Sequence, residues 1–221
     1  DWIDCMRLGE TGNEILPVLG LLNAGPNIRE IPHNFAWGSN FSIRQELLMV
    51  VGGFHPGAMP AELIFMFGDA EIHVGREVGK LGYKCLYHPD ALVEHYIPEE
   101  RISLSAIQSK FMTSGFSRSF QTLRELKEAY PLPQEAELVE IANRYFNRKS
   151  NLPKGLFSAV LAGLQEGISL HLKKFKEMPD FRKWVLRENF LDLDDCYDNP
   201  ILKAYSMSSS SHRDWRIGGN Y

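Results

Sequence analysis

The stretch FGDAEIHVG, residues 67 to 75, places Asp69, Glu71 and His73 among small and apolar residues. The apolar spacing that follows predicts a helix over residues 69–81, with both acids in its first turn. A carboxylate at a helix N-terminus is held ionised by the helix dipole, so either acid could act as a general base toward a hydroxyl group. The alternative is structural. Asp69 would cap the helix, Glu71 would favour its dipole, and His73 would hydrogen-bond Asp69.

A second polar cluster lies in FAWGSNFSIR, residues 35 to 44. Trp37 offers a stacking surface, Gly38 lets the backbone approach a bound molecule, and Ser39 and Asn40 supply polar groups. These residues indicate a ligand-facing loop. A strand end with Asn40 in a turn remains the alternative.

Metal-ligating residues are sparse along the chain. His95 is a lone histidine in a predicted strand, and its apolar neighbours favour a core histidine over a metal ligand. The pattern Asp192-Leu193-Asp194 fits a metal-diphosphate motif, but it follows a helix in an acidic turn and is interpreted as a chance match.

The spacing of apolar residues and helix breakers predicts the elements that position these groups. A short helix over 44–51 is stopped by Gly52 and Gly53, where a C-terminal cap favours positive φ. Residues 84–96 alternate as two short strands broken at Pro89-Asp90. Three glycines at helical spacing in the 69–81 helix indicate close approach by another part of the molecule: Gly75, Gly79 and Gly82. Further helices are expected over 103–129, 135–147, 154–176 and 180–189.

The helix expected over 154–176 is amphipathic, so it could lie on a membrane surface or bind a partner. A packed core helix explains the same pattern and is favoured. The chain divides by composition into a mixed α/β region, 1–98, and a helical region, 99–221.

Composition excludes several classes of protein. Twenty-four basic and 28 acidic residues give a formal charge of −4 with no block of like charge, which argues against nucleic-acid binding. The three cysteines are far apart, which argues against a disulfide framework and for a reducing compartment. No apolar run is long enough to span a membrane. We therefore expect a cytoplasmic protein, with association at the inner face of the membrane as an open alternative.

In order along the chain, these motifs resemble the C-terminal half of family-two glycosyltransferases of the GT-A fold. The matching residues are WGSNFSIRQELLMVVGGFHP and FGDAEIHVGREVGKLGYKCLYHPDALVEHYIPEERIS. They supply the family's succession of a small-residue turn, Gly-Gly-Phe, an acidic helix start, Gly-Tyr, Pro-Asp-Ala and a histidine. The resemblance implies the C-terminal part of a Rossmann-like GT-A domain, followed by a helical extension like that of certain bacterial members.

The resemblance also implies roles for individual residues. The acid at the helix start becomes the catalytic base of an inverting transfer. Asp69 is the first choice, and Glu71 is the alternative because the helix is about two residues longer than usual. His95 falls where some members place a metal ligand. Trp37, Gly38, Ser39, Asn40 and Arg101 fall on the substrate side of the site.

The implied reaction transfers a sugar from a nucleotide-diphosphate donor to a hydroxyl of a carbohydrate or lipid-linked acceptor, with Mg²⁺ or Mn²⁺ as cofactor. The family's nucleotide-binding first half has no counterpart before residue 35, so we expect a fragment or a chain completed by another polypeptide. The alternative function is a non-catalytic carbohydrate-binding or assembly module. Membrane contact through 154–176 and a homo-oligomer are further expectations.

Overall fold

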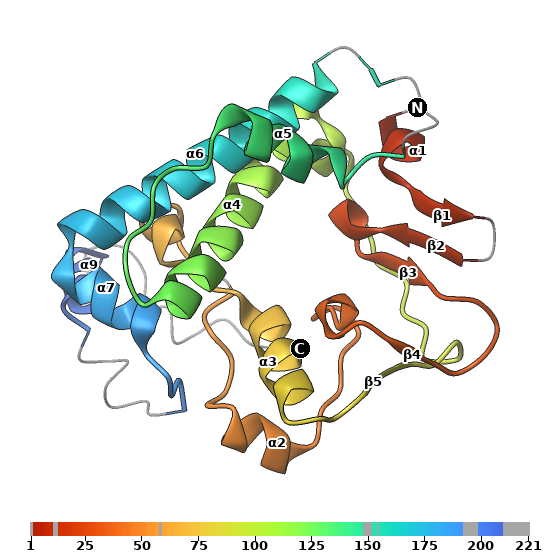
Figure 1. Ribbon diagram of the computed structural model, residues 1–221, viewed down its shortest axis with the longest axis horizontal. Helices are drawn as coiled ribbons and strands as arrows, with labels where there is room; N and C mark the ends of the chain where they lie inside the picture. The colour runs from red at the N-terminus through yellow and green to blue at the C-terminus, as the bar shows by residue number, and fades with distance from the viewer. Residues whose placement is uncertain are drawn as a thin grey trace.

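The computed structural model describes residues 2–10, 13–57, 59–147, 152–153, 155–191 and 199–209 (Figure 1). Its helices are α1 (Trp2–Met6), α2 (Gln45–Val50), α3 (Ala70–Lys80), α4 (Leu104–Leu126), α5 (Glu135–Asn143), α6 (Leu156–Glu177), α7 (Pro179–Leu186) and α9 (Pro200–Ser209). Its short 3₁₀ helices are η1 (Pro17–Leu19), η2 (His33–Phe35), η3 (Ala61–Met66) and η4 (Glu99–Ile102). Its strands are β1 (Leu8–Glu10), β2 (Asn13–Leu16), β3 (Leu21–Asn23), β4 (Arg29–Ile31) and β5 (Cys85–Tyr87).

The strands form two small antiparallel sheets. One has the order β1-β2-β3, with Ile15 opposite both Leu8 and Leu22. The other pairs β4 with β5 and places Arg29 opposite Tyr87. The expected mixture of helices and strands is therefore confirmed, and every pairing among the described strands is antiparallel.

The helix pair α4 and α6 forms the most extensive contact among the described elements, and the two helices run side by side in Figure 1. Glycines allow their backbones to meet. A Cβ atom on Gly163 would lie 2.3 Å from the carbonyl oxygen of Gln108, and one on Gly167 would lie 2.1 Å from that of Met112. Gly115 of α4 faces the backbone of α6 in return. Only residues without a side chain fit at this crossing.

Two apolar clusters are built on this pair. In one, η3 and α7 pack against α4 and α6 through Phe65, Phe116, Phe181 and neighbouring side chains. In the other, α1, β2 and α5 pack against the same two helices around Phe111. The apolar face of α6 is thus occupied by protein, as the favoured core-helix interpretation of 154–176 predicts.

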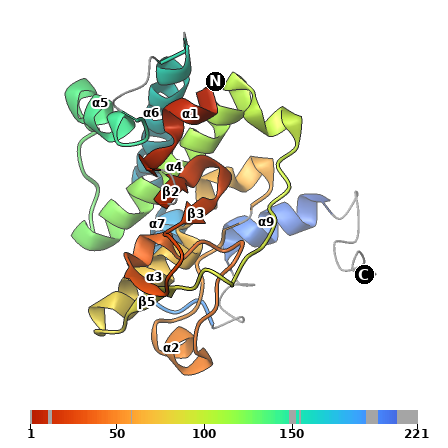
Figure 2. The same ribbon diagram turned by 90° about the vertical axis from the view of Figure 1, so that its right-hand side faces the viewer.

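Figure 2 shows α2 at one end of the molecule and α5 and α6 at the other. The Gly-Gly turn after α2 is held by the chain that follows α7. Gly52 and Gly53 have φ of 81° and 80°, and Phe190 N donates to Gly52 O at 2.7 Å. A Cβ on Gly52 would lie 2.3 Å from Glu188 O, so the turn depends on glycine for both conformation and space.

Most of the predicted helices are confirmed, with ends shifted by a few residues. The second strand predicted within 84–96 is wrong. Residues 91–96 form no ladder and are exposed, with Leu92 at 81% and Tyr96 at 82%. Their alternating pattern suits a strand, but β5 pairs with β4 and no described strand lies beside 91–96. The three-stranded sheet, α1 and α9 were not predicted.

Among the described residues, no helix combines the length and the apolar character needed to cross a membrane.

We predict that Gly167→Ala destabilises the fold, because its Cβ would clash with the Met112 carbonyl of a packed helix. The expected loss is roughly 1–3 kcal/mol, the usual cost of overpacking a core. Ser158→Ala, at an exposed position of the same helix, serves as the control. Urea unfolding followed by circular dichroism measures both variants. Equal or greater stability of Gly167→Ala would contradict the close helix contact.

Candidate functional site

The two acids at the start of α3 point to different surroundings. Between them, Ala70 has φ of 36°, a conformation that side chain-bearing residues rarely adopt. Asp69 is 3% exposed and Glu71 is half-buried. The predicted N-cap is wrong in its chemistry: Asp69 occupies the cap position, but its side chain makes no cap hydrogen bond. The unusual backbone at Ala70 separates one inward and one outward carboxylate.

Asp69 is held by α4. Ser117 Oγ donates to its Oδ1, and Gln121 Nε2 donates to its Oδ2 at 2.6 Å. Arg76 Nη1 lies 4.0 Å from Oδ2. Burial raises the pKa of Asp69 to about 7, although the two hydrogen bonds and the charge of Arg76 lower it. Asp69 is therefore a buried link between α3 and α4.

Glu71 contacts the loop that the sequence singled out. Its Oε1 accepts a hydrogen bond from the backbone N–H of Gly38 at 2.9 Å. A Cβ on Gly38 would lie 3.3 Å from this carboxylate, so the glycine permits the close approach. The structure brings together a loop and a helix start that are separated by 33 residues in the sequence.

The rest of that loop is fixed by its neighbours. Trp37 Nε1 donates to Asn34 O at 3.1 Å, and its ring meets Phe35 edge-on. Asn40 Nδ2 donates to Ala91 O. Gly38, Ser39 and Asn40 are exposed, and Trp37 is half-buried. The loop thus presents polar groups to solvent beside Glu71.

His95 is exposed, which corrects the expectation of a core histidine. Its Nδ1 lies 3.1 Å from Leu19 O and so carries the proton in that hydrogen bond. The ring occupies the space left by Gly20, whose Cβ would lie 3.2 Å from Nδ1 and 3.9 Å from Ser39 Oγ. The hydrogen bond orients His95 and brings it close to the 37–40 loop.

A divalent cation would need more than this histidine. With Nδ1 protonated, His95 offers Nε2 as one ligand, in the tautomer that a backbone carbonyl commonly fixes in metal sites. Within the described residues, no group of three His, Cys, Asp or Glu side chains gathers to complete a site. Residues 192–194 lie outside the described residues.

Arg101 is exposed in η4, immediately before α4. Its positive charge acts on Lys110, one of the residues of α4. Partial desolvation lowers the pKa of Lys110, Arg101 lowers it further, and the negative charge of Glu71 raises it.

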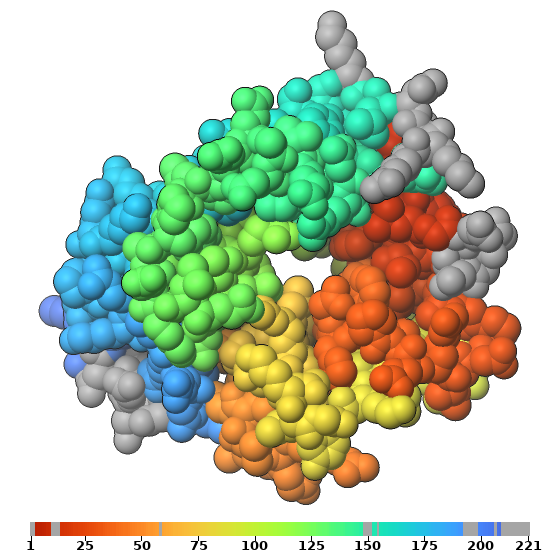
Figure 3. Space-filling model, viewed as in Figure 1, coloured from red at the N-terminus to blue at the C-terminus, as the bar shows by residue number. Residues whose placement is uncertain are grey.

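Figure 3 shows an opening through the molecule between α3 and α4 on one side and the N-terminal strands and turns on the other. The start of α3 reaches its edge. α3, which carries Glu71, and the N-terminal turns, which carry the 37–40 loop, are among the segments around this opening. The candidate site is the Glu71 face of this region.

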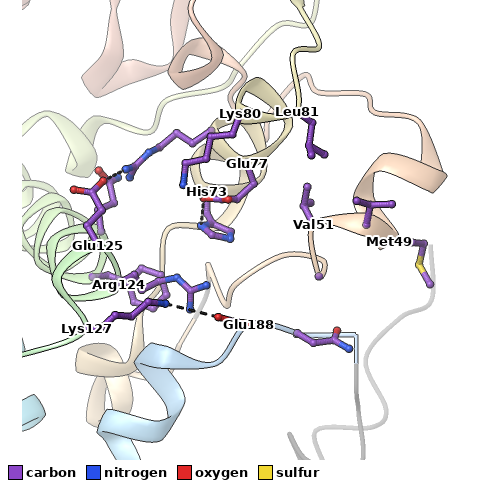
Figure 4. A pocket seen from close by; sticks show the side chains of 16 residues that line it. Met49, Val51, His73, Glu77, Lys80, Leu81, Arg124, Glu125, Lys127 and Glu188 are labelled. Atoms are coloured by element: carbon purple, nitrogen blue, oxygen red, sulfur yellow. Dashed lines mark hydrogen bonds and ion pairs between the residues drawn. The ribbon is translucent and has the colours of Figure 1, made fainter.

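A cavity lies on the opposite side of α3. Glu71 is roughly 140–240° around the helix from Arg76, Glu77 and Lys80, which line that cavity. Its volume is about 760 Å³, and α2, α4 and residues 188–189 complete its wall. Three ion pairs line it: Arg76 with Glu125, Lys80 with Glu77, and Lys127 with Glu188. Arg124, which Figure 4 shows close to Lys127, donates instead to the carbonyls of Val185 and Arg187.

His73 lies at this cavity and not beside the Asp69 carboxylate. Its ring meets His55 edge-on at 4.1 Å, and His55 in turn contacts Phe120 and Phe190. Burial lowers the pKa of His73 to about 4 and that of His55 to about 2, so both rings are neutral at physiological pH. The predicted hydrogen bond from His73 to the Asp69 side chain is not formed. This histidine packs the core.

The glycine stripe of α3 has a structural partner. A Cβ on Gly75 would lie 2.6 Å from His33 O, and one on Gly79 would lie 3.0 Å from the His33 ring. His33 Nε2 also hydrogen-bonds Tyr83 O at 2.7 Å. Close approach was predicted correctly for two glycines, whereas Gly82 has φ of 85° and open space around it.

Ser117, Gln121 and Lys110 carried no signal that would connect them to the acids. They lie on a long amphipathic helix, where polar residues usually face solvent. The contacts of Ser117 and Gln121 with Asp69 show that this face of α4 points toward α3. Ser117 and Gln121 are one turn apart, and Lys110 is two turns before Ser117.

Comparison of the chain with protein-family models, with curated proteins and with solved structures gave no match. The resemblance to family-two glycosyltransferases rests on the sequence motifs.

We predict that Asp69 makes stability fall as the pH rises. Its folded pKa of about 7 lies above the ordinary value of 3.8, so the folded protein binds more protons between these values. Stability is highest below about pH 4 with respect to this group, and up to about 4 kcal/mol is lost by about pH 7.

Asp69→Asn removes this dependence, while the histidine contributions remain in both proteins. The unfolding free energies of variant and wild type are compared by urea titrations at about pH 5 and about pH 8, and their difference should shift in favour of the variant at the higher pH. Asp180→Asn removes a more exposed carboxylate as a control. A difference that is constant with pH would show that Asp69 is not buried as described.

Proposed function

We propose that the chain is the C-terminal, acceptor-side part of a GT-A glycosyltransferase that moves a sugar from a nucleotide-diphosphate donor to a hydroxyl acceptor. The hydrogen bond between Gly38 N and Glu71 Oε1 carries this proposal. It joins the two stretches whose residue types favour ligand binding and proton transfer. Ala91 and His95, from two further motifs of the resemblance, are tied to the same region through hydrogen bonds to Asn40 and Leu19.

We assign the general base to Glu71. Asp69, the first choice from sequence, has a fully buried side chain with each oxygen engaged by α4. Glu71 is partly exposed, and one of its oxygens is free of the Gly38 hydrogen bond. A base must reach the proton that it removes, so exposure decides between the two acids.

The proposed step is an in-line displacement. Glu71 takes the proton of the acceptor hydroxyl, and the oxygen of that hydroxyl forms a bond to the anomeric carbon of the donor. The bond from that carbon to the diphosphate oxygen breaks, and the electron pair leaves with the diphosphate. The Gly38 N–H orients the carboxylate, and the 37–40 loop lies where the acceptor would be held. A divalent cation, when bound, would offset charge on the leaving group, and His95 Nε2 would be one ligand for it.

A non-catalytic carbohydrate-binding module is the second candidate. The half-buried Trp37 beside exposed polar groups favours a binding module, because the face of an aromatic ring can stack on a sugar ring. Such a module binds saccharides through the 37–40 loop without turning over any donor.

We predict that Glu71→Gln lowers donor turnover by about 10²- to 10⁴-fold in the gene product that contains this sequence. Glutamine can still accept the Gly38 hydrogen bond, so the fold is kept while the base is lost. Glu77→Gln, on the opposite side of α3, is the matched control and should turn over normally. Release of nucleoside diphosphate from a panel of nucleotide sugars provides the measurement.

Asp69→Asn should retain turnover once the rate is corrected for the folded fraction. Loss of turnover in Asp69→Asn with normal rates in Glu71→Gln would reverse the assignment of the base. Saccharide binding by the wild type without turnover of any donor would favour the binding module.

A further inference from the structure

We propose that the cavity on the far side of α3 from Glu71 binds a small monocarboxylate with an apolar body, and that Arg124 holds its carboxylate group. This site is separate from the proposed transfer of a sugar, and no motif of the sequence points to it. The size of the cavity, the hydrogen bonding of Arg124 and the division of the wall into a charged and an apolar side carry the proposal.

The cavity is large enough for a small organic molecule. Its volume of about 760 Å³ lies in the range of roughly 300–1,000 Å³ that is usual for small-molecule sites. Figure 4 shows Arg124 and Lys127 on one side of it. On the other side lie Met49, Val51 and Leu81. A molecule that spans the cavity therefore meets charged groups at one end and aliphatic groups at the other.

Arg124 is fixed in place on the charged side. Its Nη1 donates to Val185 O at 2.9 Å and also to Arg187 O. Its guanidinium carbon lies 5.5 Å from the centre of the Phe120 ring. Among the described residues, no group accepts a hydrogen bond from its Nη2 or Nε. A guanidinium binds a carboxylate through two parallel N–H groups, so this edge of Arg124 suits a carboxylate.

The positive charge of Arg124 has no acidic partner within ion-pair distance in the described part of the chain. Glu77 and Glu188 are the carboxylates whose charges act on it. Glu77 Oε1 is paired with Lys80 Nζ at 2.7 Å, and Glu188 Oε1 with Lys127 Nζ at 3.8 Å. Partial burial lowers the pKa of Arg124, because the guanidinium loses hydration. An anion bound against this partly desolvated cation would stabilise it.

The lining of the cavity carries one positive charge in excess. Four cationic side chains and three carboxylates line it, and His73 is neutral at physiological pH. One bound monoanion balances this excess, whereas a phosphate monoester would bring nearly two negative charges. The charge balance therefore favours a carboxylate over a phosphate monoester.

The apolar side of the cavity determines the rest of the ligand. Met49 is 54% exposed and Leu81 is 50% exposed, although both side chains are aliphatic. Val51 between α2 and the Gly-Gly turn is half-buried. An apolar body that covers these side chains removes hydrocarbon surface from water. The ligand class is therefore a carboxylic acid with an aliphatic or aromatic body, and not a carboxylate as small as acetate.

Binding of matched small molecules to the 221-residue chain tests this inference. Octanoate, octanamide, octyl phosphate and acetate are titrated separately at about pH 7 and low ionic strength, with heats and methyl chemical shifts as signals. Octanoate should bind about five- to tenfold more tightly than octanamide, because its carboxylate makes charge-assisted hydrogen bonds. It should bind at least about tenfold more tightly than acetate, because its chain is buried. Octyl phosphate should bind no more tightly than octanoate, and the methyl signals of Val51 and Leu81 should shift.

Arg124→Met should remove most of the preference for octanoate over octanamide. Arg144→Met, which removes an exposed cation of α5, is the matched control and should bind like the wild type. Because Arg124 also holds the chain at the end of α7, a second variant leaves that contact intact. Met49→Glu places a carboxylate on the wall of the cavity and should reduce the preference about three- to fivefold by repulsion. Leu92→Glu, at an exposed position outside the cavity lining, should not change it.

Thermal unfolding of each variant verifies that the fold is intact. Equal affinity for octanoate and octanamide overturns the inference, and so does a preference that survives unchanged in either folded cavity variant. Shifts confined to the exposed segment 91–96 would place the ligand there instead, and tighter binding of octyl phosphate would reject the carboxylate. Glu71→Gln should leave octanoate binding unchanged, so these outcomes are independent of the proposed sugar transfer.

Discussion

The close crossing of α4 and α6 is the constraint on which the rest of the structure depends. Gly115, Gly163 and Gly167 bring backbone against backbone, so the two helices have little freedom to slide or rotate. Both apolar clusters are assembled on this pair. With one face of α4 fixed against α6, a polar face of α4 is presented to α3. Ser117 and Gln121 use that face to hold Asp69, and this contact sets where α3 begins.

The site depends on this chain of contacts more than on any single residue. Asp69 anchors the start of α3 inward, Ala70 turns the backbone, and Glu71 emerges toward Gly38. Further along the helix, His33 fills the space beside Gly75 and Gly79. α3 is thus held by two separate parts of the chain, α4 at its start and His33 further along, and these contacts position the Glu71 carboxylate beside Gly38.

Local patterns in the sequence were sufficient for the helices. Breakers such as Gly52 and Gly53, and long apolar periodicity in 154–176, predicted α2 and α6 closely. The strand predicted at 91–96 is wrong because alternation shows only that the side chains suit a strand, whereas a ladder also needs a neighbouring strand. The acids were identified as a pair, but which one is buried depends on Ser117 and Gln121, which lie 48 and 52 residues after Asp69. No local signal encodes that contact. The exposure of His95 was missed for the same reason, since its partner carbonyl belongs to Leu19.

The exposed 91–96 segment has a practical consequence for handling the protein. Leu92 and Tyr96 are exposed on a stretch whose backbone has no ladder partner among the described strands, and Leu86 of the nearby β5 is 62% exposed. Unpaired backbone next to apolar side chains is a template for edge-to-edge pairing between molecules. We therefore expect the isolated chain to self-associate as its concentration rises. Light scattering over a dilution series should accompany every binding measurement made with it.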